Sequence, residues 1–369
     1  MDNNDKFYDL YDSENKFSSF HPFGIKKRWI VLGLIGVLVV TFFICNYNVI
    51  LSLSSIKRIN EKIPVYSIDI RCDVYFDEYM KQGSESAEDL IAFLSEKITH
   101  GLINPSDLQH GCSGFFAKNE EGDYLLCQNL DTPAIHVPTV TTTKIDGTNV
   151  LGISSMGQAI KSREEFNFME KVSFMAAPYL MSSGMNEYDL AITIATAGGS
   201  PSDHEENLSV FDLTVPMVVL NNAKNVPEAI EVLSNLNVVN DRFELSHYCI
   251  ADKDGACVLV EWGYDKQMKV IDSNGEAFAF ANFLMNDNPE CVGNGSDRYK
   301  RYMKRLTQNA GIISEKEAME LLHQNTLSNA MYSVVFNLSK GTMYVTFAGD
   351  YESEYFYDIK IEIFSNNHK

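Results

Sequence analysis

The run His110-Gly111-Cys112-Ser113-Gly114-Phe115-Phe116 constrains the fold of this chain more than any other segment. It predicts a strand from Cys112 to Ala117 that pairs, across a polar turn, with a second strand from Tyr124 to Leu130. The second strand closes on Gln128-Asn129-Leu130-Asp131. In such a hairpin the cysteine lies at the start of the first strand. The second strand brings an amide and a carboxylate back beside it.

The pattern around Cys112 is typical of a nucleophile at a chain end. A thiol attacks as the thiolate and therefore needs a base. Cleavage between Gly111 and Cys112 would free an α-amine with a pKa of about 8, which can take the proton of its own thiol. Gly111 suits such a step, because a residue without a side chain lets the scissile peptide adopt a strained conformation. The alternative is a buried structural cysteine at a strand start.

Composition excludes several classes of function. The 369 residues are 45% hydrophobic and 22% charged, which is enough to bury the core of one large domain or two ordinary ones. The net charge of −20 disfavours nucleic acid as a partner. The seven cysteines form no CxxC pair, which disfavours a zinc ribbon or a dense disulfide framework. Asp203-His204-Glu205-Glu206 predicts an exposed acidic loop, because consecutive residues point in different directions. We expect no metal and no cofactor.

The N-terminal region predicts a membrane anchor. Trp29 to Cys45 is an uncharged apolar run that continues, after one polar residue, in Val49 to Leu53, and it is long enough to span a bilayer. The preceding Lys26-Lys27-Arg28 favours a cytoplasmic N-terminus and an extracytoplasmic remainder, although Lys57 and Arg58 weaken the asymmetry. A cleaved signal peptide is the alternative, but no small-x-small cleavage site follows the first run.

The remaining patterns predict a layered α+β domain. A helix is expected over Ser86 to Ile98, and a second hairpin over Tyr248 to Asp252 and Cys257 to Trp262. Strands interleaved with helices favour two packed sheets with helices outside. Further strands are expected at Leu190–Thr196, Met268–Asp272, Phe278–Phe283, Met331–Asn337 and Thr342–Phe347. Further helices are expected at Glu164–Met181, Val226–Leu236, Asp297–Asn309 and Glu315–Gln324, the last with a capping box of Ser314 and Glu317.

Six blocks of the sequence, taken in order, resemble a known family. They are Cys112-Ser113-Gly114 with Asp131, Gly184-Met185-Asn186-Glu187, the strand pair His247 to Trp262, Ala281-Asn282-Phe283, Ser296-Asp297-Arg298-Tyr299, and Tyr332-Ser333-Val334-Val335-Phe336-Asn337. From Cys112 to about Asp350 the chain resembles the linear amide C-N hydrolases of the Ntn superfamily. These include bile salt hydrolases, penicillin V acylase, the ceramidase-like amidases and the fungal penicillin acyltransferase. The resemblance implies a four-layer αββα sandwich of two antiparallel sheets.

The resemblance also implies roles for the matching residues. Cys112 would be the nucleophile, and Asp131 would orient its amine and thiol by accepting hydrogen bonds. Asn282 would give an amide donor to the developing oxyanion. Arg298 would hold the site's carboxylate and depress the thiol's pKa. Thr196 stands at the strand end where relatives place an oxyanion-side Asn or Tyr, so only its backbone N-H is expected to act. Without the resemblance, the local sequence predicts that Asp131 is a solvated carboxylate at the end of the hairpin. It likewise predicts that Arg298 is part of a solvated cationic helix face.

Gln128 departs from part of the family. Bile salt hydrolases and the ceramidase-like amidases carry arginine there, whereas the penicillin acyltransferase branch carries Gln-Asn-x-Asp, as this chain does. Gln128 can donate and accept hydrogen bonds but brings no charge, so a carboxylate or sulfonate on a substrate would have to be met elsewhere. Bile salts are therefore not the expected substrates.

These observations predict a membrane-anchored N-terminal-cysteine amidase that hydrolyses small N-acyl amides through a thioester. The expected organisation is a cytoplasmic tail (1–28), a single-pass anchor (29–53), a linker and propeptide-like segment (54–111) and an extracytoplasmic Ntn-hydrolase domain (112–369). Acyl transfer from the same thioester is an alternative, as is an inactive binding domain of this fold. A papain-like enzyme pairing Cys112 with His247 is a further alternative, without its Cys-Gly-Ser-Cys-Trp signature. Whether the chain forms a homo-oligomer is left open.

Overall fold

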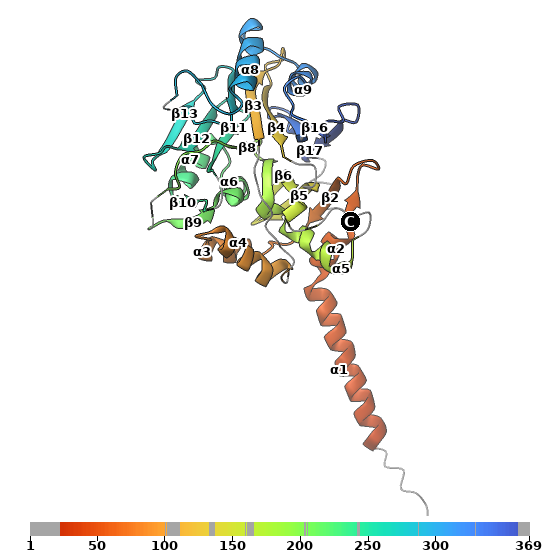
Figure 1. Ribbon diagram of the computed structural model, residues 1–369. Helices are drawn as coiled ribbons and strands as arrows, with labels where there is room; N and C mark the ends of the chain where they lie inside the picture. The colour runs from red at the N-terminus through yellow and green to blue at the C-terminus, as the bar shows by residue number, and fades with distance from the viewer. Residues whose placement is uncertain are drawn as a thin grey trace, which may run out of the picture. The chain divides into compact units, whose positions relative to one another are not determined.

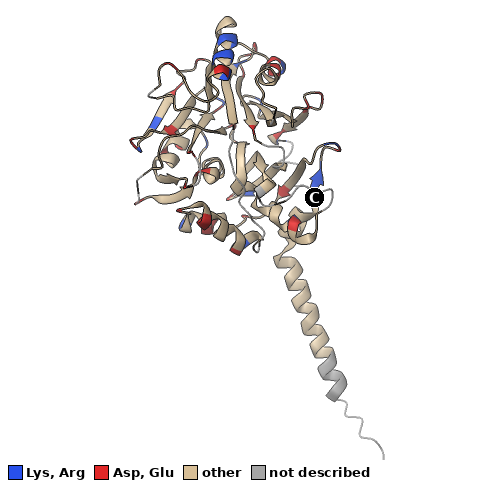
Figure 2. Ribbon diagram, in the orientation of Figure 1, with Lys and Arg blue, Asp and Glu red and all other residues tan. Residues whose placement is uncertain are grey.

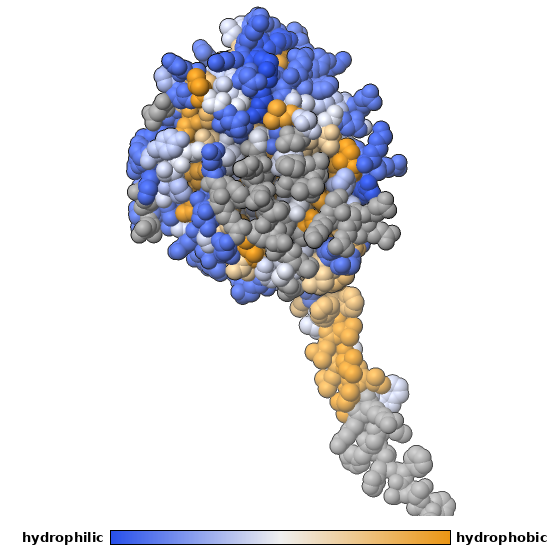
Figure 3. Space-filling model, in the orientation of Figure 1, coloured by the Kyte–Doolittle hydropathy of each residue, from blue (hydrophilic) through white to orange (hydrophobic). Residues whose placement is uncertain are grey.

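The chain divides into two compact units, Met1–Tyr47 and Asn48–Lys369. The computed structural model describes residues 23–99, 101, 111–132, 137–158, 160, 166–202, 204, 206–241, 244–286, 288–328 and 330–360. In the first unit it describes helix α1 (Phe23–Cys45), whose apolar side chains from Trp29 onward are exposed (Figure 3). Leu38 is 68% exposed and Ile44 is 70% exposed. No single helix in the described residues is long and apolar enough to cross a membrane. Trp29–Cys45 and Tyr47–Ser54 meet that test only together, as a bent pair.

The second unit is built on two large β-sheets, here called sheet A and sheet B. In the described residues, sheet A runs β1 (Lys57–Arg58), β2 (Tyr66–Ile70), β5 (Pro138–Ile145), β6 (Thr148–Ser155), β7 (Met181–Asn186), β8 (Ala191–Thr196), β11 (Ser246–Ala251), β12 (Cys257–Trp262), β13 (Met268–Asp272). Sheet B runs β14 (Phe278–Ala281), β3 (Gly111–Lys118), β4 (Tyr124–Asp131), β15 (Ala330–Asn337), β16 (Thr342–Phe347), β17 (Tyr355–Asp358). A small parallel pair joins β9 (Leu208–Phe211) and β10 (Leu236–Val239).

The expectation of two antiparallel sheets holds with one exception. Every strand pairing described in sheet B is antiparallel. In sheet A the β2–β5 pairing is parallel. The exception arises because β2 belongs to the segment before Cys112 and joins the edge of a sheet that the following residues build. That segment, predicted as a linker and propeptide, contributes β1 and β2 to sheet A.

The two sheets pack face to face, and helices cover their outer faces (Figure 1). Between the sheets lies an apolar cluster that includes Phe116 and Leu126 from sheet B and Leu151 and Leu259 from sheet A. Tyr302 and Leu322, from the helices α8 (Ser296–Gln308) and α9 (Glu315–His323), pack on the outer face of sheet B. The outer face of sheet A is covered by the other core helices. They are α3 (Phe76–Gln82), α4 (Ala87–Leu94), α6 (Val215–Asn222) and α7 (Val226–Ser234). The unit also contains α2 (Tyr47–Ser54) and α5 (Phe168–Ser173).

The structure confirms most of the elements predicted from the sequence. The β3–β4 and β11–β12 hairpins form, with β8, β13, β15 and β16 at their expected places. β14 ends at Ala281, two residues before the expected Phe283. The helices α7, α8 and α9 match their predictions within two residues at each end, and Ser314 and Glu317 form the capping box. The predicted Ser86–Ile98 helix forms as α4, capped by Ser86, and ends in a wider turn over Ser95–Thr99.

The helix predicted over Glu164–Met181 is wrong for most of its length. Only α5 is α-helical, and a tighter 3-10 helix follows over Phe174–Leu180 before Met181 opens β7. Pro178 lies inside the tighter helix, where its missing N-H interrupts α-helical hydrogen bonding. All seven residues of Phe174–Leu180 are buried, so the apolar spacing reflects contact on every side of the segment. The first residues of the predicted helix lie outside the described ranges.

Gly114 allows β14 to lie close against β3. A Cβ at this position would come within 2.5 Å of the Phe280 ring and would also meet the carbonyl oxygen of Cys127. The ring of Phe280 occupies the space that a side chain would need. The close fit of β14 on β3 matters for the site, because residue 282 follows directly after β14.

Candidate active site

Cys112 lies at the start of β3, on the face of sheet B that meets sheet A. In the β3–β4 register, Gly111 faces Asp131 and Cys112 faces Leu130. The Cys112 side chain has no exposed surface and belongs to the apolar cluster between the sheets. The structure therefore places the cysteine of the intact chain in the interior, beside the carboxylate that the hairpin returns.

Asn282 hydrogen-bonds to the backbone on both sides of this cluster. Its Oδ1 accepts the backbone N-H of Cys112 at 2.8 Å. Its Nδ2 donates to the carbonyl oxygen of Thr196, at the end of β8, at 2.8 Å. One side chain therefore connects β3 of sheet B to the last residue of β8 in sheet A. In this state the Asn282 oxygen faces the cysteine, whereas the resemblance implied a role for its nitrogen.

Arg298 fixes that orientation from the first turn of α8. Its side chain is only 2% exposed. Nη1 donates to Asp131 Oδ2 at 2.7 Å and to Ser113 Oγ at 3.2 Å, and Nη2 donates to Asn282 Oδ1 at 2.9 Å. A guanidinium donates only, so the Asn282 atom that it meets must be the oxygen. The prediction that Arg298 is solvated is wrong, although Arg301 of the same helix is half exposed. The ribbon of α8 carries several basic residues (Figure 2).

Asp131 is a fully buried carboxylate rather than a solvated hairpin end. Its Oδ2 pairs with Arg298, and its Oδ1 accepts the backbone N-H of Leu327 at 3.2 Å. Burial raises the pKa of Asp131 to about 6, while the Arg298 charge and the Leu327 N-H oppose the rise. The carboxylate is therefore ionised at neutral pH but becomes protonated in mild acid.

The thiol of Cys112 is held neutral in the intact chain. Burial raises its pKa above the ordinary range, and the Asp131 charge adds to the rise. The Arg298 charge and hydrogen bonds from the backbone at Thr196 and Asp131 oppose it. The expected involvement of Thr196 through its backbone is consistent with these contacts. A thiol in this environment needs a base before it can attack.

A neutral polar cluster lies beside Cys112 between the two sheets. Gln128 donates through Nε2 to the carbonyl oxygen of Ile194 and accepts the Tyr332 hydroxyl at 3.4 Å. The Tyr332 hydroxyl also meets Ser182 Oγ at 2.9 Å and Ser183 Oγ at 2.8 Å. Sequence reasoning singled out Gln128 but missed its partners. The tyrosine in a segment where relatives read Trp-Ser-Val-Val was the available signal.

The structure bears on two interpretations of the nucleophile, a strained Gly111 peptide and a Cys112–His247 pair. Gly111 lies in β3 as an ordinary strand residue and is not among those with positive φ, so its peptide shows no strain of that kind. His247 lies against Glu261, with Nδ1 and Oε2 3.6 Å apart, and its ring contacts Phe280. The contacts of Cys112 come from other residues, so they give the papain-like alternative no support. Asp203 and Glu205 of the acidic loop lie outside the described residues.

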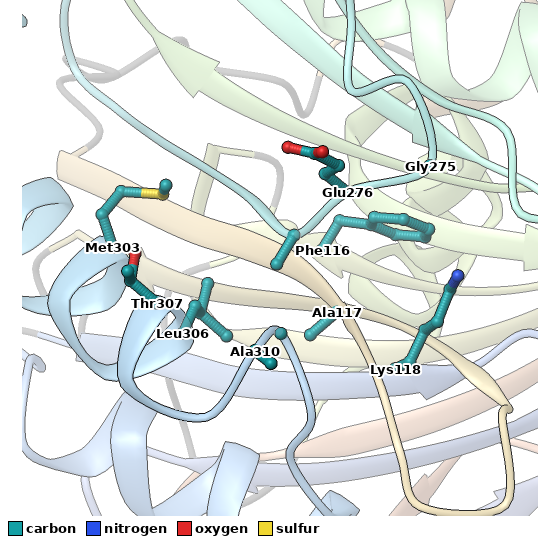
Figure 4. A pocket seen from close by; sticks show the side chains of 11 residues that line it. Phe116, Ala117, Lys118, Gly275, Glu276, Met303, Leu306, Thr307 and Ala310 are labelled. Atoms are coloured by element: carbon teal, nitrogen blue, oxygen red, sulfur yellow. The ribbon is translucent and has the colours of Figure 1, made fainter.

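A cavity of about 410 Å³ lies near the far end of β3, between α8 and the turn at residues 275–277 (Figure 4). Its lining includes Phe116 and Lys118 from the strand and Met303 and Leu306 from the helix. None of the site residues described above lines it. The cavity is therefore separate from the cysteine site.

The fold and site define a mixed α+β protein with a cysteine, a carboxylate, an amide and a guanidinium joined by hydrogen bonds. Residues 112–280 match the family described as linear amide C-N hydrolases, choloylglycine hydrolase family. This match confirms the family resemblance over residues 112–280, which contain the first three of the six sequence blocks. The protein is a hydrolase that acts on linear amide C-N bonds.

Several solved structures are similar to the chain at low identity. A mutant of conjugated bile acid hydrolase from Clostridium perfringens is 18% identical, with a TM-score of 0.45 over 68% of this chain and 93% of that one. Penicillin V acylase from Agrobacterium tumefaciens is 14% identical, with a TM-score of 0.49 over 68% and 86%. The Caenorhabditis elegans ortholog of N-acylethanolamine-hydrolyzing acid amidase is 16% identical, with a TM-score of 0.37 over 62% and 93%. No curated protein sequence matches the chain.

Replacement of Arg298 by methionine tests the buried ion pair. In the wild type the folded-state pKa of Asp131, about 6, lies above its unfolded value. The stability that the raised pKa of Asp131 contributes is therefore complete below about pH 4, and it is lost as pH rises through about 6. Without Arg298 the pKa rises further and the loss is larger. We expect R298M to lower the free energy of unfolding by about 3–5 kcal/mol at pH 8, and by less at pH 5.

The measurement is urea denaturation in a Cys112→Ala background at both pH values. Arg305→Met is the matched control, because Arg305 pairs with Glu317 at 3.0 Å in a partly exposed position of the same helix. We expect this control to change stability by less than about 1 kcal/mol at either pH. A pH-independent effect of R298M would contradict the proposed electrostatic role of the Arg298–Asp131 pair.

Proposed function

We propose that this chain is the precursor of an N-terminal-cysteine amidase, which cleaves its own peptide between Gly111 and Cys112. The observation that carries the proposal is the 2.8 Å hydrogen bond from the Cys112 N-H to Asn282. That N-H belongs to the amide that would break. A charged Arg298 holds the same Asn282 oxygen, and the thiol is close enough to Asp131 for that charge to raise its pKa. The nitrogen that becomes the new chain end is thus already bound by a fixed side chain.

The cleavage reaction balances without any cofactor. Cys112 Sγ attacks the Gly111 carbonyl carbon, a C-S bond forms, and the C-N bond to Cys112 breaks. The thiol proton passes to the departing nitrogen, and ionised Asp131, whose charge acts on the thiol, assists this transfer. Water then hydrolyses the thioester, which leaves a Gly111 carboxylate and a free Cys112 thiol and α-amine.

The mature site would use the same groups on an N-acyl substrate. The new α-amine takes the thiol proton, the thiolate attacks the substrate carbonyl, and the amine product leaves with that proton. Water hydrolyses the resulting acyl thioester and releases the acid. The backbone at Thr196 lies close to the sulfur, which is the place for a donor to the oxyanion. An amine in place of water would give acyl transfer, the second use of the same intermediate.

The cleavage step is tested by the mass of the purified full-length protein. We expect the wild type to give a fragment that begins at Cys112, and Cys112→Ala to remain intact, because it lacks the sulfur. Cys127→Ala is the matched control, since Cys127 is equally buried on the neighbouring strand and we expect its variant to be cleaved. An intact wild-type chain that still hydrolyses amides would refute the processing step.

The polar cluster at Gln128 supports a preference for uncharged substrates. Gln128, Tyr332, Ser182 and Ser183 offer hydrogen bonds but no charge. The charge of Arg298 is already used by Asp131 within the protein. An anionic group on the substrate would enter this buried region without a compensating cation, which is costly. The preferred substrates are therefore N-acyl amides that carry no carboxylate or sulfonate close to the scissile bond.

Two substrates that differ only in charge test this preference. We expect the matured enzyme to hydrolyse N-decanoylglycinamide with a kcat/KM at least about tenfold higher than N-decanoylglycine, because one uncompensated charge is worth more than about 1.4 kcal/mol. Steady-state assays at pH 7.5 measure both values. Conjugated bile salts, which carry an anionic group beside the amide, should also be poor substrates. Equal kcat/KM values for the matched pair would contradict the proposal.

We also propose that residues 29–53 attach the enzyme to a membrane, with the hydrolase domain on the extracytoplasmic side. The exposed apolar surface of α1 supports attachment, since Leu38 and Ile44 would otherwise face water. The cationic run before Trp29 supports the orientation.

Fractionation of expressing cells tests the attachment. We expect the chain in the membrane fraction after a carbonate wash. A variant with Leu34, Leu38 and Phe42 changed to serine should be released, because polar groups destabilise insertion. Protease added to intact cells should reach the hydrolase domain. Release of the unmodified chain by carbonate would contradict membrane insertion.

A further inference from the structure

His247 and Glu261 form a buried pair between the two sheets, next to the residues of the site. His247 has no exposed surface and Glu261 is 1% exposed. The distance of 3.6 Å between Nδ1 and Oε2 is a close contact but is too long for a hydrogen bond. In the described part of the chain, neither His247 nitrogen has a hydrogen-bond partner. Buried polar groups of this kind are rare and often serve function rather than stability.

The carboxylate of Glu261 holds the chain just after Asn282. It accepts the backbone N-H of Met285 at 3.0 Å and that of Asn286 at 2.7 Å. The contact with His247 and the two backbone hydrogen bonds lower the pKa of Glu261 and keep it ionised despite burial. The segment that follows Asn282 is therefore fixed to β12 by a charged acceptor.

The imidazole of His247 contacts the chain just before Asn282. Its ring meets the Phe280 ring edge to face, with centroids 5.8 Å apart. Phe280 lies on β14, two residues before Asn282, and its ring fills the space above Gly114. His247 also pairs in the sheet register with Ala195, the neighbour of Thr196. The pair thus lies against the chain on both sides of Asn282 and against β8, whose last residue accepts a hydrogen bond from Asn282.

We propose that Glu261 and His247 are positioning residues, which hold Asn282 at the correct distance from Cys112 and Thr196. The inference rests on the proposed function and adds two residues to it. Asn282 makes hydrogen bonds of 2.8 Å on each side, one to each sheet. Both bonds fail together if the 280–286 segment moves. Glu261 fixes the segment behind Asn282, and His247 fixes it in front.

Glu261→Gln is the first test. The amide keeps the size of the side chain but removes the charge and one of the two acceptor oxygens for Met285 and Asn286. We expect cleavage at Cys112 to slow by about 100-fold and kcat of the matured enzyme to fall by a similar factor. KM for N-decanoylglycinamide should stay within about twofold, because Asn282 acts on the reacting atoms.

Asp252→Asn is the matched control on the same hairpin. Asp252 is 3% exposed and accepts the backbone N-H groups of Val226, Asp254 and Ala256, at the opposite end of β11 and β12. We expect its variant to lower the midpoint of thermal unfolding as much as E261Q does, with processing and kcat close to wild type. This comparison separates positioning from general loss of stability.

Two substitutions at His247 keep the test informative if E261Q does not fold. His247→Gln retains a polar group beside Glu261, and His247→Leu retains only the volume. We expect H247Q to keep processing and kcat within about fivefold of wild type and H247L to lose about 100-fold in each. Loss of kcat in D252N equal to that in E261Q, unchanged processing in E261Q, or equal values for H247Q and H247L would overturn the inference. A wild type that is never cleaved would instead overturn the processing step, while the kcat comparison would still test the pair.

Discussion

The buried hydrogen bonds of Arg298 are the interaction on which the site depends. One guanidinium reaches Asp131 on β4 and Asn282 after β14, and its planar geometry sets the distance between them. Three elements far apart in sequence therefore meet at one cation. A buried ion pair contributes little to net stability, since desolvation offsets the attraction. Its value here is to fix which atom of Asn282 faces the Cys112 nitrogen.

The sequence contained enough to find the members of the site but not their contacts. The hairpin signal located Cys112 and Asp131, because pairing within a hairpin is set by local register. Asn282 and Arg298 came from ordered sequence blocks rather than from any local pattern. Which amide atom of Asn282 faces the cysteine depends on a guanidinium from another element, so spacing alone does not reveal it. For the same reason the partners of Tyr332, contributed by β7, were not predicted.

Secondary structure was predicted best where one periodicity dominates. α8 and α9 present an apolar stripe to sheet B, and the polar residues on their other faces make the helical spacing clear. Phe174–Leu180 is buried on every side, so its sequence carries no such contrast and resembled a helix that continues. β2 was missed because its place in sheet A, between β1 and β5, depends on pairing with β5, which follows the cysteine in the sequence.

The place of β2 has a consequence for what a broken peptide would do. Its five residues pair with β5, and Tyr66, Ile68 and Ile70 are buried in the core on sheet A. Scission before Cys112 would therefore produce two polypeptides that stay interlocked through backbone hydrogen bonds and shared apolar contacts. The smaller polypeptide, which includes α1, would act as a non-covalent tether. Dissociation of the two pieces would require sheet A to lose its edge strands β1 and β2. The mature enzyme would therefore stay bound to α1 although the backbone is cut.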